Sequence, residues 1–126
     1  MSRNSDVLRG GYDAFARQDI PTVLALFEPD IVWNAPDTVR HGGTFKGRDE
    51  VLGFFMKLPE SYQHLEVKPR QFVEQDDTVV VLGDLVGTGA NGDFDIPFVH
   101  VWTVQDGKAT SFTEYFDTVR MNKAIG

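Results

Sequence analysis

The chain has no cysteine. It therefore cannot form disulfide bonds, has no thiolate nucleophile, and lacks the ligands of most structural zinc sites. This absence agrees with a reducing compartment. The first six residues, MSRNSD, show none of the apolar core of a secretory signal, and no stretch approaches membrane-spanning length. We therefore expect a cytoplasmic protein.

Basic residues are few, with 12 Lys and Arg against 19 Asp and Glu and a formal net charge of -7. Such a charge repels phosphate backbones and anionic lipid headgroups, so we predict no nucleic-acid and no membrane partner. The histidines at 41, 64 and 100 lack the i, i+4 spacing of metal ligands. Residues 87–92, GTGANG, match the dinucleotide motif G-x-G-x-x-G, but a strand follows where that motif needs a helix. The sequence thus predicts neither a metal nor another cofactor.

The composition is that of a compact globular protein, with 126 residues, 41% of them hydrophobic and 25% charged. We expect one domain over 1–126. Apolar residues at helical spacing predict a helix from about Ser5, a second from the N-cap Asp19 through Phe27, and a third that ends at Pro59. The predicted strands cover 30–35, 65–74, 78–88, 95–105 and 109–118, and a loop is expected over 36–47.

This element order predicts an α+β fold, with three N-terminal helices packed on the concave face of a strongly curved antiparallel sheet that encloses a pocket. In the last two strands, period two places the even positions together on one face of each strand. The even positions include Phe98, His100, Trp102, Phe112, Glu114 and Phe116. A three-residue loop over 105–107, with Gly107 in the left-handed region, joins even with even, whereas a two-residue loop joins even with odd. Burial of the aromatic rings favours the first register.

On this register His100 and Glu114 neighbour each other inside an aromatic pocket. A carboxylate beside an imidazole fixes its tautomer and raises its basicity, while desolvation favours the neutral carboxyl, so either group is able to carry a proton near neutral pH. We interpret the pair as candidates for general acid/base catalysis. The alternative interpretation is a histidine that is hydrogen-bonded for structural reasons only.

Tyr12 and Trp33 are expected to close the far wall of the pocket, although core packing explains both equally well. Asp84 is a third candidate for catalysis. Its face is undetermined, because the loop over 87–93 leaves the register open, and solvent exposure is an equal alternative. The predicted substrate-binding residues are all aromatic: Phe15, Trp33, Phe54, Phe55, Phe98, Trp102, Phe112 and Phe116.

Several segments carry a family resemblance: 12–19, 27–33, 45–51, 101–108 and 114–117. The chain resembles the SnoaL-like family of the nuclear transport factor 2-like, or ketosteroid-isomerase-like, superfamily along nearly its whole length. The resemblance implies the cone-shaped fold that is also called cystatin-like. Superfamily members include polyketide cyclases, steroid isomerases, epoxide hydrolases, dehydratases and non-catalytic proteins, so the fold does not choose a reaction.

The resemblance also carries implications for single residues. SnoaL-type cyclases have a histidine and an acid/base aspartate at the positions of His100 and Glu114. Steroid isomerases have their aspartate base at Ala35 and a protonated aspartate at His100, and their catalytic tyrosine falls near Tyr12. Limonene epoxide hydrolase has aspartates at Asp84 and Glu114, but its arginine and asparagine are replaced here by Leu82 and Ala35. Neither of these two mechanisms is complete in this chain.

Our hypothesis is a polyketide cyclase-like, isomerase-like or lyase-like enzyme that performs proton transfer on a small apolar carbonyl compound. Glu114 would act as acid/base with His100 as partner, assisted by Tyr12 or Asp84. The alternatives are a non-catalytic protein that binds a small hydrophobic or aromatic ligand, and an interaction protein whose pocket is filled by its own rings. Homodimerisation through the outer sheet face is predicted from Val99, Val101 and Tyr115.

Overall fold

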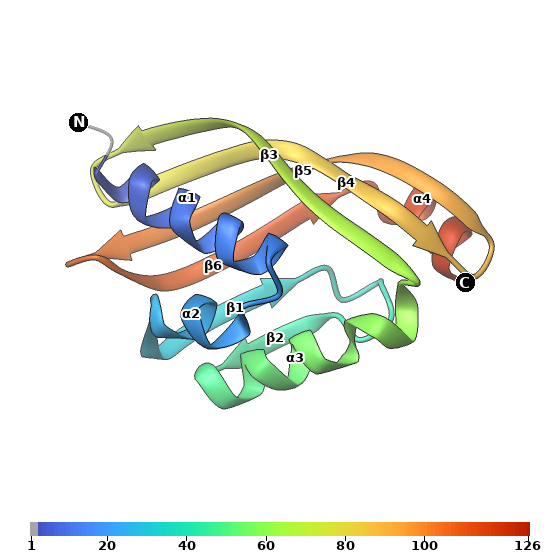
Figure 1. Cartoon of the computed structure of the whole chain (residues 1–126), viewed down its shortest axis with the longest axis horizontal. Coiled ribbons are helices and arrows are strands. Elements are labelled where there is room, and N and C mark those ends of the chain that lie inside the picture. Colours follow the sequence, from blue (N-terminus) through green and yellow to red (C-terminus); the bar gives the residue numbers. More distant parts are fainter. Residues whose placement is uncertain (1–2) are drawn as a thin grey trace.

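The computed structural model describes residues 3–126 (Figure 1). The helices are α1 (Arg3–Ala16), α2 (Ile20–Ala25), α3 (Arg48–Ser61) and α4 (Thr118–Ile125). The strands are β1 (Phe27–Ala35), β2 (Gly43–Lys46), β3 (His64–Gln75), β4 (Thr78–Gly89), β5 (Gly92–Gln105) and β6 (Lys108–Phe116).

The strands form one sheet in the order β2-β1-β6-β5-β4-β3. Neighbouring strands are antiparallel except β1 and β6, which run parallel. Figure 1 shows the long strands β3 to β6 bending across the molecule, with α1, α2 and α3 on one side of the sheet. The predicted α+β fold, in which three N-terminal helices cover a strongly curved sheet, is confirmed.

Two elements are missing from the prediction. β2 lies inside the segment that was expected to be a loop, and it pairs with β1 so that Trp33 lies opposite Phe45. α4 begins where the last strand was expected to end. Its N-cap Asp117 accepts a hydrogen bond from the backbone N–H of Arg120 at 3.1 Å. α4 buries Met121 and Ile125 against the turn between β4 and β5.

Two predicted boundaries are wrong. Phe27 opens β1 instead of ending the second helix, because the Leu26 carbonyl accepts from the backbone N–H of Ala109 at 2.8 Å and ties this point to β6. α3 runs through Pro59 to Ser61. A proline costs the helix one backbone donor, but the Tyr62 N–H, three residues further on, still bonds to the Leu58 carbonyl at 2.9 Å.

The hairpin between β5 and β6 reaches the predicted register by a different route. Its loop has only two residues, Asp106 and Gly107, both with positive φ (52° and 77°), as a type I′ turn requires. A two-residue loop alone would join even with odd positions. The ladder, however, steps from Val104 opposite Ala109 to Thr103 opposite Ser111, so Thr110 is an extra, bulged residue. This bulge restores the even-with-even pairing that places His100 opposite Glu114.

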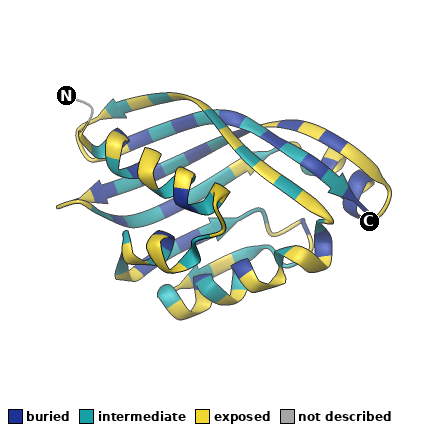
Figure 2. Cartoon of the chain, viewed as in Figure 1, coloured by how far each residue is buried: buried dark blue, intermediate teal, exposed yellow. Residues whose placement is uncertain are grey.

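Burial alternates residue by residue along β4 and β5, with one face turned to the core (Figure 2). Gly83 lies on the inner face of β4. A Cβ atom at this position would lie 2.5 Å from the Phe98 ring, so the missing side chain makes room for that ring. The Phe98 ring therefore packs between Gly83 and the imidazole of His100.

Candidate functional site

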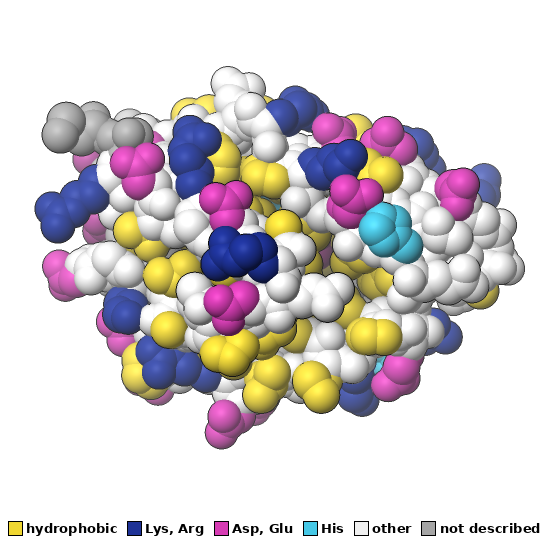
Figure 3. All heavy atoms as spheres, viewed as in Figure 1, with side chains coloured by type: hydrophobic (Ala, Val, Ile, Leu, Met, Phe, Trp, Pro, Cys, Tyr) yellow, Lys and Arg dark blue, Asp and Glu magenta, His cyan; other side chains and the backbone are white. Residues whose placement is uncertain are grey.

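A cavity of about 100 Å³ lies between the inner face of the sheet and the helices. Figure 3 shows the surface hollowed on this side of the molecule, with hydrophobic side chains around the hollow. α1, α2 and α3 supply one wall, and β1, β3, β4, β5 and β6 supply the other. The titratable side chains among its lining residues are Tyr12, Tyr62, His100 and Glu114. The cavity is therefore apolar, with one small group of polar side chains.

Most of the predicted aromatic residues line this cavity: Phe15, Trp33, Phe54, Phe55, Trp102, Phe112 and Phe116. Their part in binding a substrate remains a prediction. Phe98 does not line it, and this expectation is corrected. The Phe98 ring stacks on the imidazole of His100, with ring centroids 3.9 Å apart and planes 22° apart. Alternation along a strand gives the face of a residue, but a ring on the inner face can still be covered by its neighbours.

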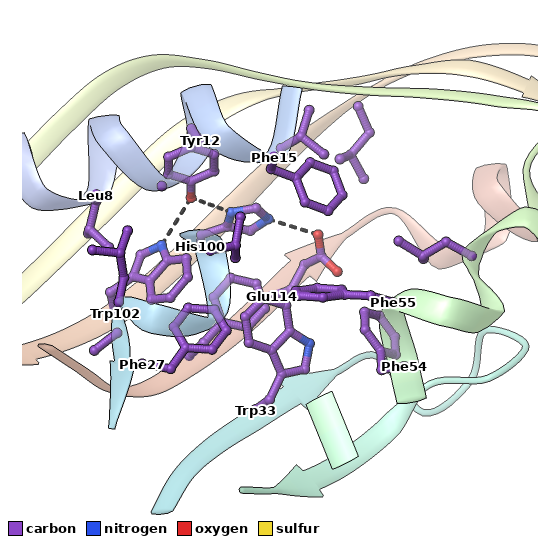
Figure 4. A pocket seen from close by; sticks show the side chains of 18 of the residues that line it. Leu8, Tyr12, Phe15, Phe27, Trp33, Phe54, Phe55, His100, Trp102 and Glu114 are labelled. Carbon is purple, nitrogen blue, oxygen red and sulfur yellow. Dashed lines mark hydrogen bonds and ion pairs between the residues drawn. The ribbon is translucent and has the colours of Figure 1, made fainter. Parts of the chain in front are cut away.

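His100 and Glu114 meet inside the cavity, as the predicted register requires (Figure 4). His100 Nε2 lies 2.8 Å from Glu114 Oε2, and His100 Nδ1 lies 2.6 Å from the Tyr12 hydroxyl oxygen. Trp102 Nε1 donates to the same hydroxyl at 3.0 Å. These four side chains come from α1, β5 and β6, and they form one continuous chain of hydrogen bonds.

The direction of each hydrogen bond in this chain of four side chains follows from which groups are able to donate and which to accept. The indole N–H of Trp102 is able only to donate, so the Tyr12 oxygen accepts from it. The Tyr12 O–H then donates to His100 Nδ1, and the remaining imidazole proton, on Nε2, is donated to Glu114. In this arrangement His100 is neutral, Glu114 is a carboxylate, and every donor has an acceptor.

The opposite direction leaves a buried donor unpaired. If His100 Nδ1 donated to Tyr12, the hydroxyl oxygen would accept two hydrogen bonds, and its own O–H would have no acceptor among the described residues. A buried unpaired donor costs roughly 1–3 kcal/mol. Burial raises the pKa of Tyr12. The hydrogen bond from Trp102 lowers it by a smaller amount, and the charge of Glu114 adds a still smaller increase. Tyr12 therefore keeps its proton and remains a donor.

The imidazole of His100 is held in place from several sides. It is 3% exposed, with the Phe98 ring stacked on it and the edge of Phe112 at a centroid distance of 4.7 Å. Glu114 is less enclosed, since 14% of its side chain is exposed. Its Oε2 accepts from His100, and Oε1 has no hydrogen bond from any described residue. The site thus presents one oriented carboxylate oxygen to an apolar cavity.

Asp84 is not part of this site, and the expectation that it assists catalysis is corrected. It alternates with the inward residues Gly83 and Leu85 on β4, so its side chain lies on the outer face of the sheet. There Arg70 Nε donates to Asp84 Oδ2 at 3.1 Å. Since the strand pairs Asp84 with Pro97 on β5 and Lys68 on β3, no rotation of its side chain brings it to the inner face.

Tyr62 is a functional candidate that the sequence analysis missed. It follows α3 directly and lines both the main cavity and a smaller one of about 30 Å³ beneath residues 36–42. Burial, with a smaller contribution from the charge of Glu114, raises the pKa of Tyr62 to about 12. Its hydroxyl forms no hydrogen bond with any described residue. Tyr62 stands at a helix end, where no periodic pattern indicates the direction of a side chain.

Trp33 Nε1 is the one buried side-chain nitrogen or oxygen in residues 3–126 without a hydrogen-bond partner. The indole ring stacks on Phe112 at a centroid distance of 3.7 Å and packs against Phe54 and Phe55.

Within the described part of the chain, residues 3–126, no three His, Asp or Glu side chains are grouped as metal ligands. None of its helices has the length and hydropathy to cross a membrane.

Comparisons with known proteins identify a family and several solved structures that resemble this chain. The family described as SnoaL-like domain matches residues 8–112. An NTF2-like protein of unknown function from Burkholderia pseudomallei K96243 is 39% identical, with a TM-score of 0.93, over 99% of this chain and 98% of its own. TerC, co-crystallised with polyporic acid, is 34% identical, with a TM-score of 0.92, over 98% of each chain. No curated protein matches the chain.

A candidate SnoaL-like polyketide cyclase from Jannaschia sp. CCS1 shares the fold at 20% identity, with a TM-score of 0.85, over 98% of this chain and 92% of its own. The fold and the site together define a small cone-shaped α+β protein with an aromatic cavity that contains a histidine–carboxylate pair. The chain belongs to the SnoaL-like family, and its solved relatives include NTF2-like proteins.

Proposed function

We propose that this protein is an enzyme that removes a proton from the carbon next to the carbonyl group of a small apolar compound, with Glu114 as the base. The observation that supports this proposal most strongly is the carboxylate of Glu114, which lines the cavity and is bonded through Oε2 to His100, while Oε1 has no hydrogen-bond partner among the described residues. A base in an apolar site acts best when its orientation is fixed before the substrate binds.

The proposed step is a simple proton transfer. Glu114 Oε1 takes the proton, the C–H electron pair forms a C=C bond, and the carbonyl π electrons move to the oxygen, which gives an enolate. Cyclisation by aldol addition, isomerisation of a double bond and dehydration by elimination all begin in this way. The hydrogen bonds of His100 and Tyr12 keep the carboxylate oriented, while the aromatic walls exclude water.

A small ring ketone tests the proposal without knowledge of the natural substrate. The cavity is lined by aromatic rings with few polar side chains, so 2-indanone, with one aromatic ring and a carbonyl between two equivalent CH₂ groups, is a suitable probe. We expect the protein to accelerate exchange of these CH₂ protons for deuterium in D₂O at neutral pH, as followed by proton NMR. No acceleration above the buffer rate would contradict the proposal.

Glu114→Gln is the decisive variant. The glutamine keeps the shape of the side chain and still offers an oxygen to His100 Nε2–H, but it is not a base. We expect the exchange rate to fall by at least about 100-fold, the lower end of general-base effects, with the dissociation constant of 2-indanone within about threefold. Asp84→Asn is the matched control, because this carboxylate lies on the outer face and should leave the rate unchanged.

The second candidate function is non-catalytic binding of a small hydrophobic or aromatic ligand in the same cavity. It is favoured by Ala35, which offers no polar group where steroid isomerases have their base. The likeness to TerC makes polyporic acid the first natural compound to test as a ligand. Binding of 2-indanone or polyporic acid together with an exchange rate equal to that of Glu114→Gln would favour this alternative over the enzyme.

A further inference from the structure

Removal of a proton next to a carbonyl group leaves negative charge on the carbonyl oxygen. In an apolar cavity this charge needs a hydrogen-bond donor that is already in place, because water is excluded. The cavity lining contains five side chains with N–H or O–H donors: Tyr12, Trp33, Tyr62, His100 and Trp102. Which of them is free to meet a substrate follows from the hydrogen bonds described above.

Three of these donors are already committed. Trp102 donates to Tyr12, Tyr12 donates to His100, and His100 donates to Glu114. A substrate oxygen that accepted a hydrogen bond from any of these donors would replace its present acceptor and interrupt the hydrogen bonds that orient Glu114. The catalytic tyrosine of the steroid isomerases falls near Tyr12, yet here the Tyr12 hydroxyl donates its proton to His100.

Trp33 is uncommitted but covered. Its Nε1 is buried and has no hydrogen-bond partner among the described residues. The centroid of the Trp33 ring lies 5.3 Å from that of Phe55 and 6.0 Å from that of Phe54, so the indole is covered by packed rings. A ligand would have to displace one of these phenylalanines to reach it. Trp33 therefore does not supply a donor that is ready before binding.

Tyr62 is the donor that remains. It lines the main cavity and the smaller one, both of which Glu114 also lines, and its hydroxyl has no partner among the described residues. Tyr62 and Glu114 do not hydrogen-bond to each other, although they line the same cavity, Tyr62 from the C-terminal end of α3 and Glu114 from β6. A donor and an acceptor separated in this way leave room for a group of the ligand between them.

We infer that Tyr62 is a catalytic residue that donates a hydrogen bond to the substrate oxygen on which charge develops, while Glu114 removes the proton. This inference rests on the proposed function and adds a feature of the substrate: its carbonyl oxygen and its acidic C–H bond face two different walls of the cavity. Tyr62 keeps its proton throughout. The proton that Glu114 removes from carbon returns to the substrate from Glu114 or is exchanged with solvent. The raised pKa of Tyr62 agrees with a donor that is not itself ionised.

The test uses Tyr62→Phe and the probe 2-indanone. Loss of one donor to a developing oxyanion lowers rates by roughly 100-fold or more. We expect Tyr62→Phe to slow exchange of the 2-indanone protons by about 100-fold while its dissociation constant rises less than about fivefold. Tyr115→Phe is the matched control, because Tyr115 lies on the outer face at 58% exposure and should exchange protons at the wild-type rate. Equal rates in wild type and Tyr62→Phe would overturn the inference.

A second readout separates this inference from the proposed function. The infrared C=O stretch of bound 2-indanone falls in frequency when the oxygen accepts a hydrogen bond, and it is measured in the Glu114→Gln protein, which does not turn over the probe. We expect the lowered frequency to return toward the value of an apolar solvent in Glu114→Gln/Tyr62→Phe. An unchanged frequency would overturn the role of Tyr62. A shift that depends on Tyr62, without any exchange in the wild type, would support the donor while the proposed base failed.

Discussion

At the scale of single residues, the Tyr12 hydroxyl holds the site together, since it is both an acceptor for Trp102 and a donor to His100. Tyr12→Phe removes one oxygen and leaves the Trp102 N–H buried without a partner. We expect the free energy of unfolding to fall by about 2 kcal/mol, within the range for an unpaired buried donor. Chemical denaturation measures this change, and Tyr115→Phe should change stability by less than about 0.5 kcal/mol.

NMR gives this prediction a residue-specific readout. The chain has two tryptophans, so its indole N–H groups give two signals. Tyr12→Phe should move the signal of Trp102 toward that of an unbonded indole and leave the signal of Trp33 in place. In the wild-type protein the proton of His100 should be on Nε2. A proton found on Nδ1 would show that the direction assigned to the hydrogen-bond chain is wrong.

The sequence alone predicted the neighbouring positions of His100 and Glu114 because period two and the burial of aromatic rings both restrict the register. It did not determine which partners those groups have. The face of Asp84 was undetermined for lack of a register, and Phe98 was placed on the correct face but stacks on His100 and does not line the cavity. Tyr62 was missed because a residue that follows a helix belongs to no pattern. Partners depend on contacts across elements, which periodicity does not report.

At the scale of elements, the bulge at Thr110 decides which side chains of β6 enter the cavity. Deletion of Thr110 would leave a regular ladder in which Trp102 still faces Phe112 and His100 still faces Glu114. Deletion of Thr113 instead would turn Glu114 and Phe116 to the outer face. We expect the first deletion to cost about 1–2 kcal/mol and the second to cost more than about 3 kcal/mol, because it exposes the partly buried ring of Phe116 and leaves the buried His100 Nε2–H without its acceptor.

Thermal unfolding followed by circular dichroism, together with binding of 2-indanone, compares the two deletions. The variant without Thr110 should unfold cooperatively and bind the probe. If it unfolds as readily as the variant without Thr113, then the bulge supplies curvature that the sheet requires, and pairing alone does not explain its presence.

Elements with strong local signals were predicted, and the missed ones show what such signals lack. β2 has four residues, too few for alternation to be recognised, and it exists because β1 offers a free edge. α4 did carry signals, an N-cap at Asp117 and apolar residues at 121, 124 and 125, but they lie directly after a strand, and no element was predicted beyond residue 118. The two-residue loop shifts the register by one residue and the bulge shifts it back. The prediction therefore gave the correct pairing of even with even positions but the wrong loop length, and it did not include the bulge.

At the scale of the whole molecule, the outer face of the sheet is unusually apolar for a surface. Alternation places Val80, Leu82, Val99, Val101 and Tyr115 on this face, opposite to the cavity. Tyr115 is 58% exposed, and Val73 on β3 is 47% exposed. Apolar side chains clustered on a sheet face are typical of protein interfaces.

We propose that two copies of the chain associate through this face, so that the mass in solution at micromolar concentration is about twice 14.1 kDa. Val101→Lys places a charge at the centre of the face and should give a monomer that still binds 2-indanone, because the cavity lies on the other side of the sheet. Met56→Lys on α3 is the matched control, since Met56 is 72% exposed but away from the outer face. Light scattering after size-exclusion chromatography measures the mass. A monomeric wild-type protein, or dissociation caused equally by both substitutions, would show that the outer face is not the interface.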